Sequence, residues 1–172
     1  ALVCFIVQNV GDQLTPEGED ATTFWGEGDE AIVKYANAIC DTIDKYGYDG
    51  FDYDYEPNYG HRGNISGVPA AEKVFVETLS RRLGPKSGTD KMLVIDGEPQ
   101  TINSELGPCF NYFIVQAYQC TGDANLDGRL QGTIMNFNGV LEPEEVAKKY
   151  IVTENFENFA LAGGVSFTDR NG

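Results

Sequence analysis

The chain has 172 residues, of which 41% are hydrophobic and 12% aromatic, a composition that fits a folded domain and excludes a disordered one. Twelve Lys and Arg residues against 27 Asp and Glu residues give a formal net charge of -15. This charge disfavours nucleic acid and anionic membrane surfaces as partners, and no stretch is apolar for long enough to cross a bilayer.

The first predicted element is a strand over residues 1–9, because a continuous apolar run of this length is typical of a strand buried on both faces of a parallel sheet. Polar residues enter only at its C-terminal end, where Gln8 is followed by Asn9. Residues 11–28 then form a long loop that carries Trp25. Loops of this length inside a domain are usually functional, so this loop is a candidate binding segment.

Residues 29–46 are predicted to form a helix, because apolar residues recur at spacings of three and four. The stripe consists of Ile32, Tyr35, Ala36, Ile39, Ile43 and Tyr46. Asp29 is the predicted N-cap of this helix, and Gly47 is its predicted C-terminal stop. A strand follows at once, and strand, helix, strand is the crossover unit of a parallel sheet.

Residues 48–57, which read YDGFDYDYEP, alternate aromatic and acidic side chains, and this alternation predicts a β-strand. One face holds Phe51, Tyr53 and Tyr55, and the other holds Asp52, Asp54 and Glu56. Because helical segments flank the strand, we expect both faces to be covered. A covered row of carboxylates is costly, since like charges at close range oppose ionisation, and it indicates a functional role. Glu56 stands at the C-terminal tip, where α/β barrels carry their chemistry.

Two other interpretations of this acidic row are a calcium site and a solvated strand face. Calcium loops of the helix–loop–helix kind need a Gly after the third ligand and a distant bidentate Glu, and the sequence has neither here. The aromatic partner face and the break at Gly50 argue against a solvated face. The single His61 and four cysteines without metal-binding spacing leave little for a zinc site, so we expect no metal and no cofactor.

The four cysteines divide into two pairs by context. Cys4 lies in an apolar strand and Cys40 on the apolar side of a helix, so both are predicted to be small core residues. Cys109 and Cys120 are either free thiols or the two halves of a disulfide bridge, and the sequence does not decide between these alternatives.

The rest of the chain repeats the strand–helix pattern. Further predicted strands cover residues 92–95, 112–118 and 150–155. Further predicted helices cover residues 70–83, a stripe from Leu126 to Phe137, and residues 142–149. Residues 58–69 and 120–127 are predicted loops, and residues 100–111 form a short link with room for about one or two helical turns.

Each predicted strand turns polar at its C-terminal end. Glu98 follows the third strand along the chain, and Glu154 lies at the end of the fifth. In the fourth strand, Gln116 and Tyr118 share a face by parity and stand at the C-terminal end.

Five strand–helix periods predict an α/β fold with a parallel sheet. A complete (β/α)8 TIM barrel needs about 250 residues, or about 200 at the least, so this chain holds about five of its eight units. An open doubly wound sheet is the alternative, but no Gly-rich phosphate turn follows the first strand. Because the chain begins inside a strand, we expect residues 1–172 to be a single catalytic domain that is truncated or partial at both ends.

The acidic strand also carries a resemblance. Residues 49–56, which read DGFDYDYE, resemble the DGxDxDxE signature of glycoside hydrolase family 18, the chitinases and endo-β-N-acetylglucosaminidases. Tyr55 stands where chitinases commonly have Trp, and the segments VQN at residues 7–9 and VQAY at residues 115–118 are more similar to the endoglycosidase branch of gut Bacteroidetes. By this resemblance the acidic strand is the fourth of the barrel, so the first two strands and the eighth would lie outside residues 1–172.

The resemblance implies retaining hydrolysis in which the 2-acetamido group of the substrate attacks the anomeric carbon. It implies that Glu56 is the general acid and then the base, that Asp54 orients the acetamido N–H, and that Asp52 tunes Asp54. It also implies that Tyr118 hydrogen-bonds the acetamido oxygen and that Gln116 helps to hold it. To act as an acid near neutral pH, Glu56 needs a pKa well above the ordinary value of about 4.3.

The resemblance implies an endo-β-N-acetylglucosaminidase that cuts the N,N'-diacetylchitobiose core of an N-glycan or N-glycoprotein and is secreted, periplasmic or on the bacterial cell surface. Asn9, Trp25, Glu98 and Glu154 are weaker candidates for sugar contacts, since loop packing or capping explains them as well. The alternatives are a chitinase, which would carry more exposed Trp, and a glycan-binding protein of the same fold without turnover. The preferred glycan and the oligomeric state stay open.

Overall fold

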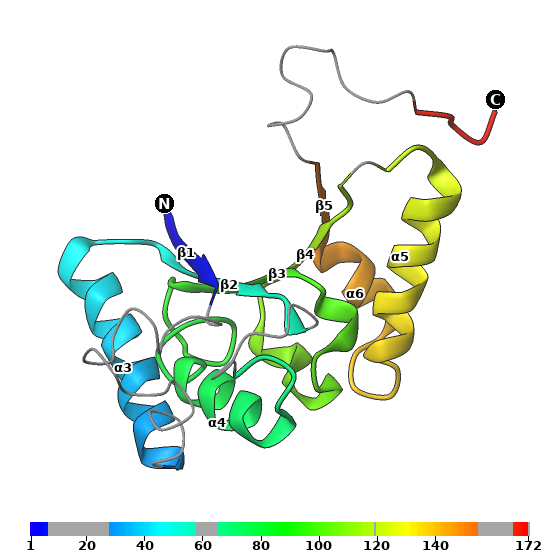
Figure 1. The fold of residues 1–172 in the computed structure, drawn as a ribbon. Helices are drawn as coiled ribbons and strands as arrows, with labels where there is room; N and C mark the ends of the chain where they lie inside the picture. The colour runs from blue at the N-terminus through cyan, green and yellow to red at the C-terminus, as the bar shows by residue number, and fades with distance from the viewer. Residues whose placement is uncertain (7–27, 58–64, 119, 155–166, 172) are drawn as a thin grey trace, which may run out of the picture.

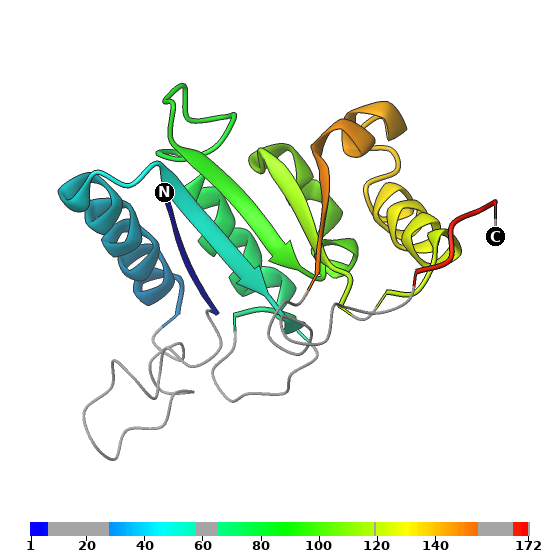
Figure 2. The same cartoon turned by 90° about the horizontal axis from the view of Figure 1, so that it is seen from above.

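The computed structural model describes residues 1–6, 28–57, 65–118, 120–154 and 167–171. Within them, five parallel strands pair in chain order. The strands are β1 (Leu2–Ile6), β2 (Gly50–Tyr55), β3 (Met92–Gly97), β4 (Tyr112–Gln116) and β5 (Tyr150–Thr153). Helices lie along one side of the sheet, and the strands all run in the same direction (Figures 1 and 2). This is the arrangement of consecutive strand–helix units in a (β/α)8 barrel, as predicted.

Helical segments connect the strands. They are α3 (Asp29–Tyr46), α4 (Pro69–Leu79), α5 (Asp123–Asn136), α6 (Pro143–Lys149) and, between β3 and β4, the short 3-10 helices η3 (Pro99–Thr101) and η4 (Ser104–Cys109). The predicted stripe of α3 faces the sheet except at Tyr46, which is 62% exposed. Tyr46 is the last helical residue, and the left-handed Gly47 that follows (φ 71°) turns the chain away. The predicted N-cap is wrong by one residue, because Gly28 occupies that position and Asp29 begins the helix.

Several predicted boundaries differ from the structure; for example, β2 covers Gly50–Tyr55 instead of residues 48–57, and β3 extends to Gly97 instead of residue 95. α4 ends at Leu79 instead of residue 83, because residues 80–82 continue as turns and residue 83 is a bend. α5 begins at Asp123, inside the predicted loop, because its first turn bonds a distant segment: the Asp123 N–H donates to the Thr168 carbonyl at 3.4 Å. β4 ends at Gln116, two residues before the predicted end of that strand.

The helix-covered face of the sheet contains the hydrophobic core. Phe51, Tyr53 and Tyr55 on β2 are each 1% exposed or less, as their alternation predicted. The ring of Tyr53 meets the ring of Phe75 on α4 edge-on at 5.4 Å between centroids, and the ring of Tyr35 on α3 stacks on Phe75 at 5.9 Å. The outer face of β2 is therefore the centre of the packed layer between the sheet and the helices α3 and α4.

The opposite face of the sheet has no helix over it in the described part of the chain (Figure 1). Asp52 and Asp54 lie on this face and are only partly buried. The expectation that both faces of β2 are covered is therefore not met by the described residues. The strands that close a barrel over its inner face would cover these acids, and the described residues contain only five of the eight strands.

The cysteines correct one prediction and decide an open one. Cys40 is buried, as predicted, but Cys4 is exposed because it lies on the inner face beside Asp52. Cys109 and Cys120 are both buried free thiols, so no bridge joins them. Among the described helices, none has the length and apolar character needed to cross a membrane.

Candidate active site

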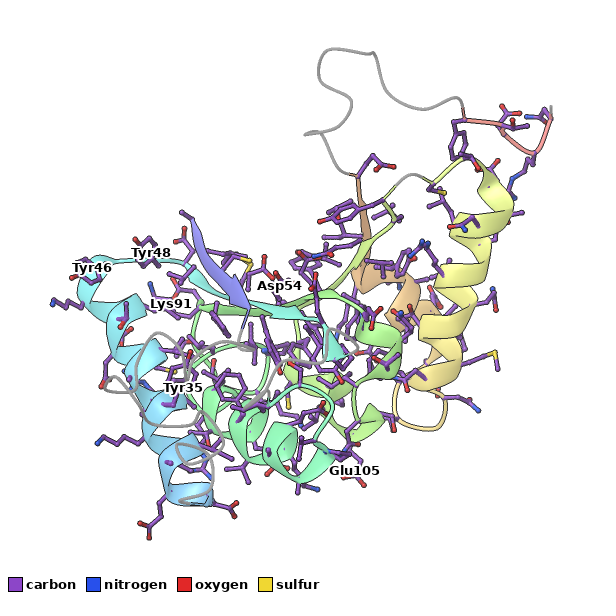
Figure 3. The ribbon with its side chains drawn as sticks, in the orientation of Figure 1. Tyr35, Tyr46, Tyr48, Asp54, Lys91 and Glu105 are labelled. Atoms are coloured by element: carbon purple, nitrogen blue, oxygen red, sulfur yellow. The ribbon has the colours of Figure 1, made fainter. Side chains whose placement is uncertain are left out.

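Parallel pairing aligns the inner-face residues of neighbouring strands in rows. Asp54 on β2 is in register with Asp96 on β3, and Asp52 is in register with Cys4 on β1. In-register residues of parallel strands point to the same face, so three carboxylates and a thiol meet on the open side of the sheet. Figure 3 shows Asp54 on the side of the sheet away from Tyr35 of α3.

Two glycines allow these strands to pair closely around the acids. A Cβ atom on Gly50 would collide with the backbone of Met92, and one on Gly97 would lie 2.5 Å from the Tyr55 carbonyl oxygen. Both glycines also have φ values, 153° and 104°, that other residues rarely adopt. The acids of β2 and β3 are therefore framed by two positions that require Gly.

Gln116 connects the two acids that are in register. Its Nε2 donates to Asp54 Oδ1 at 3.4 Å and to Asp96 Oδ2 at 3.2 Å. Asp96 Oδ1 also accepts the N–H of Gly97 at 2.8 Å. The side chains of three consecutive strands, β2, β3 and β4, thus form one hydrogen-bonded group at the C-terminal half of the sheet.

Asp52 lies one step deeper and is poorly satisfied. Its Oδ1 is buried and accepts no hydrogen bond from the described residues. The Cys4 thiol bonds the same carboxyl group. Although Cys4 is exposed overall, partial desolvation of its thiol and the charges of Asp52 and Asp54 raise the pKa of this thiol to about 12, so the sulfur stays protonated.

The acids raise the pKa values of one another. Burial, the Glu56 carboxylate and two further acids raise the pKa of Asp54 to about 7, although the Gln116 amide lowers it. Burial and the charge of Asp96 raise the pKa of Asp52 to about 6. Burial likewise raises the pKa of Asp96. The pKa of Asp54 therefore lies near neutral pH, so this carboxyl group can gain or lose a proton there.

The remaining predicted residues stand at different places. Glu56 directly follows the last residue of β2 and is partly buried, and its charge acts on Asp54. Tyr118 is 44% exposed, and the alternation of buried and accessible residues in β4 continues through it.

Glu98, a candidate for sugar contacts, precedes η3, and its N–H donates to the Tyr55 carbonyl at 3.0 Å. Glu154 is exposed just after β5. Asn9 and Trp25 lie outside the described residues.

The structure brings together Asp52, Asp54 and Gln116 from the predicted set, and it adds Asp96 and Cys4. The signal for Asp96 was present, because an acid ends the strand that follows the acidic strand. The pattern alone does not distinguish Asp96 from Glu98, which directly follows the strand, since only the β2–β3 register shows which acid faces Asp54. The apolar neighbours of Cys4 in sequence predict a core residue, whereas the strand register places it beside Asp52.

The arrangement is suited to acid–base work on a neutral substrate. Among the described residues, no group of three or more His, Cys, Asp or Glu side chains has the geometry to hold a metal ion. The acids lie at the C-terminal end of parallel strands, which is where enzymes with this architecture carry their active sites. A carboxyl group that keeps its proton near pH 7 can act as a general acid or hold a hydrogen bond to a substrate.

Comparisons with known proteins identify related sequences. The family model described as glycoside hydrolase family 18, BT1044-like, matches residues 1–172. Endo-β-N-acetylglucosaminidase F2 from Elizabethkingia meningoseptica is 28% identical over 156 residues, which cover 88% of this chain and 39% of that protein.

Solved structures share the fold. BT1044, in a selenomethionine form with a Glu-to-Gln substitution, matches with a TM-score of 0.79 and 35% identity over 98% of this chain and 53% of its own. The apo form of an endo-β-N-acetylglucosaminidase from Cordyceps militaris matches with a TM-score of 0.60 and 19% identity over 88% of this chain and 44% of its own. At that identity the second likeness concerns the fold alone. The chain spans 39–53% of the length of these three relatives.

Proposed function

Because this chain belongs to glycoside hydrolase family 18, we propose that it carries the acid site of an endo-β-N-acetylglucosaminidase. The proposed enzyme hydrolyses the β-1,4 bond in the N,N'-diacetylchitobiose core of N-glycans. The relationship to an endo-β-N-acetylglucosaminidase at 28% identity supports this substrate class over others in the family. Because the chain spans less than half of that relative, the activity is proposed for the protein that contains this chain.

The observation that carries the proposal is the acidic row of β2. Its side chains lie on the inner face of the sheet, and the Gln116 amide from β4 contacts Asp54 at 3.4 Å. A neutral glycan meets no repulsion from a chain with a net charge of -15, whereas a polyphosphate does. Both features fit a site that acts on an uncharged sugar bond by moving protons.

The proposed reaction is retaining and substrate-assisted. The oxygen of the substrate's 2-acetamido group attacks the anomeric carbon while Glu56 donates its proton to the departing glycosidic oxygen. An oxazolinium ion forms, and Glu56, now a base, takes a proton from the water that opens it. Each carboxyl function is thereby restored at the end of the cycle.

Asp54 and its neighbours handle the acetamido group. Asp54 orients the acetamido N–H and balances the positive charge of the oxazolinium ion. Asp52, one step deeper, shares a proton with Asp54, which is consistent with the raised pKa of both groups. Tyr118 donates a hydrogen bond to the acetamido oxygen, and Gln116 helps to hold the same group.

The test is product analysis with two glycoproteins, one of high-mannose and one of complex type. We expect release that leaves a single N-acetylglucosamine on each former glycosylation site, detected by mass spectrometry of the protein and of the glycan. Cleavage of chitin oligomers with no action on either glycoprotein would replace the proposal by a chitinase. If the protein binds the glycans but does not hydrolyse them, the proposal would be replaced by a glycan-binding protein.

A further inference from the structure

Asp96 is the acid that stands closest in register to Asp54. The two residues are paired across β2 and β3, and neighbouring strands lie about 4.8 Å apart. Both side chains are on the inner face and both are partly buried. Two carboxylates at this separation oppose each other's ionisation, so the surroundings of each group determine which of them ionises first.

Hydrogen bonds stabilise the ionised form of Asp96 more than that of Asp54. It accepts the Gln116 amide at 3.2 Å and the Gly97 N–H at 2.8 Å, one on each carboxylate oxygen. Among the described residues, only the Gln116 amide donates to Asp54, at 3.4 Å. Donors stabilise a carboxylate over the neutral acid, so Asp96 is the better anion of the pair and ionises first, and the remaining proton stays with the acids of β2.

The orientation of Gln116 depends on the same pair. Its side-chain nitrogen faces both carboxyl groups, and an amide oxygen in that place would be repelled by either anion. The backbone carbonyl of Gln116 accepts Arg129 Nη1 of α5 at 3.3 Å, so the residue is held from behind as well. Asp96 thus fixes the amide that meets Asp54.

We propose that Asp96 is a positioning residue of the hydrolytic site, which holds the Gln116 amide against Asp54 and, as the ionised partner, keeps the shared proton on β2. This inference rests on the proposed function, in which Asp54 orients the acetamido group of the substrate. It adds to the site a residue of β3, which lies outside the acidic row of β2. Asp96 acts on the substrate only through Asp54 and Gln116.

The titratable groups that face Asp96 come from two strands in the described part of the chain. β1 contributes Cys4, whose thiol stays neutral because its pKa is raised to about 12. β2 contributes Asp52 and Asp54, with Glu56 beyond them at the tip. β4 contributes Gln116, which does not titrate. Removing the Asp96 charge should therefore affect only the carboxyl groups of β2, whose pKa values should fall.

The first test is a titration that needs no substrate. The side-chain carboxyl carbon of Asp54 is followed by NMR against pH in the unmodified protein and in Asp96→Asn. We expect the midpoint, about pH 7 in the unmodified protein, to fall by about one pH unit, since one nearby charge is lost at a partly solvated site. Asp90→Asn is the matched control: this exposed acid precedes β3 at its opposite end, and its loss should not move the midpoint.

Gln116→Met supplies a second variant with the opposite sign. It removes the amide that stabilises both anions while Asp96 stays charged, so the Asp54 midpoint should rise. A general loosening of the site would move the midpoint in one direction in both variants. An unchanged midpoint in folded Asp96→Asn, or shifts of equal sign in the two variants, would overturn the role of Asp96.

A pH–rate profile links the titration to catalysis. On the proposed mechanism the acidic limb of kcat/KM follows the ionisation of Asp54, so it should move in Asp96→Asn by the amount seen by NMR. If glycan is hydrolysed and the limb stays in place, the inference fails and the proposed function stands. If no glycan is hydrolysed by any form, the proposed function fails, and the NMR titration alone decides whether Asp96 controls the proton.

Discussion

The two faces of β2 show opposite solutions to the same problem, because each carries polar atoms away from bulk water. On the outer face, the Tyr53 hydroxyl bonds Ser66 Oγ at 2.7 Å and the Tyr55 hydroxyl donates to Glu72 at 2.7 Å. On the inner face, Asp52 keeps an oxygen without a donor among the described residues. The outer face is built for stability, and the inner face holds groups whose protonation is easily changed.

The contrast appears within single steps along the chain. Tyr53 is fully buried and packed, while Asp52 and Asp54 on either side of it are partly accessible and have raised pKa values. A strand separates such neighbours because successive side chains point to opposite faces. One strand therefore anchors the sheet to its helices and presents an acid site without a conflict between the two tasks.

Removing the anchor should have the largest effect on stability. Tyr53→Ala leaves a cavity in a fully buried layer and removes the hydroxyl that bonds Ser66 Oγ, so the free energy of unfolding should fall by about 3–5 kcal/mol. Tyr46→Ala is the matched control, since that ring is 62% exposed and its loss should cost less than about 0.5 kcal/mol. Urea unfolding of both variants measures the difference. Equal losses would mean that the outer face is not the anchor.

An inner-face substitution should have the reverse profile. Asp54→Asn keeps the size of the side chain but cannot balance an oxazolinium charge, so we expect glycan release to slow by about 10²–10³-fold. Its stability at pH 8 should be at least that of the unmodified protein, because a partly buried charge is removed. Kinetics and unfolding are measured on the same samples. A large loss of stability would place Asp54 among the structural residues.

Glu72 tests whether the outer face depends on satisfied polar atoms. Its Oε1 accepts both the Tyr55 hydroxyl at 2.7 Å and the Gly67 N–H at 2.5 Å, and the residue is 2% exposed. Glu72→Ala leaves two donors unpaired and should cost about 2–3 kcal/mol. Glu72→Gln keeps an acceptor oxygen and should cost about 1 kcal/mol or less. Thermal unfolding compares the two, and equal costs would show that packing, not bonding, matters here.

The smallest effect concerns pH. The pKa of Asp52 is raised from 3.8 to about 6 in the folded protein, so folding binds its proton more tightly than the unfolded chain does. This contribution to stability is complete below about pH 4 and is lost as the pH rises through about 6. Because solvent screens the half-exposed group, we expect a loss of about 1 kcal/mol.

Asp52→Asn should remove this part of the pH dependence. Urea unfolding of the variant and of the unmodified protein between pH 4 and pH 8 gives the two curves, and their difference should change across the titration of Asp52. The exposed Asp90→Asn serves as the control with an unchanged curve. Parallel curves for Asp52→Asn would show that this acid does not contribute to the proton balance of folding.

Local patterns predicted what depends on local geometry. The alternation in residues 48–57 assigned both faces of β2, and the helical stripe assigned the buried residues of α3, because each follows from the period of one element. Strand order followed from the repeated strand–helix units.

Local sequence patterns could not predict contacts between distant segments. The start of α5 depends on Thr168 and Arg170, whose bonds to Asp123 join residues more than forty positions apart. The place of Asp96 opposite Asp54 depends on the register of two strands, which no pattern within either strand defines. Cys4 was misplaced for the same reason, because its neighbours in space are acids and its neighbours in sequence are apolar.

The measurement that bears most directly on the account is glycan release by Glu56→Gln in the protein that contains this chain. Glutamine fits the space of Glu56 but supplies no proton to the glycosidic oxygen, so release should fall by about 10³-fold or more while the unfolding midpoint stays where it was. Glycan release at the unmodified rate by the folded variant would contradict the assignment of the inner face of β2 as the catalytic face.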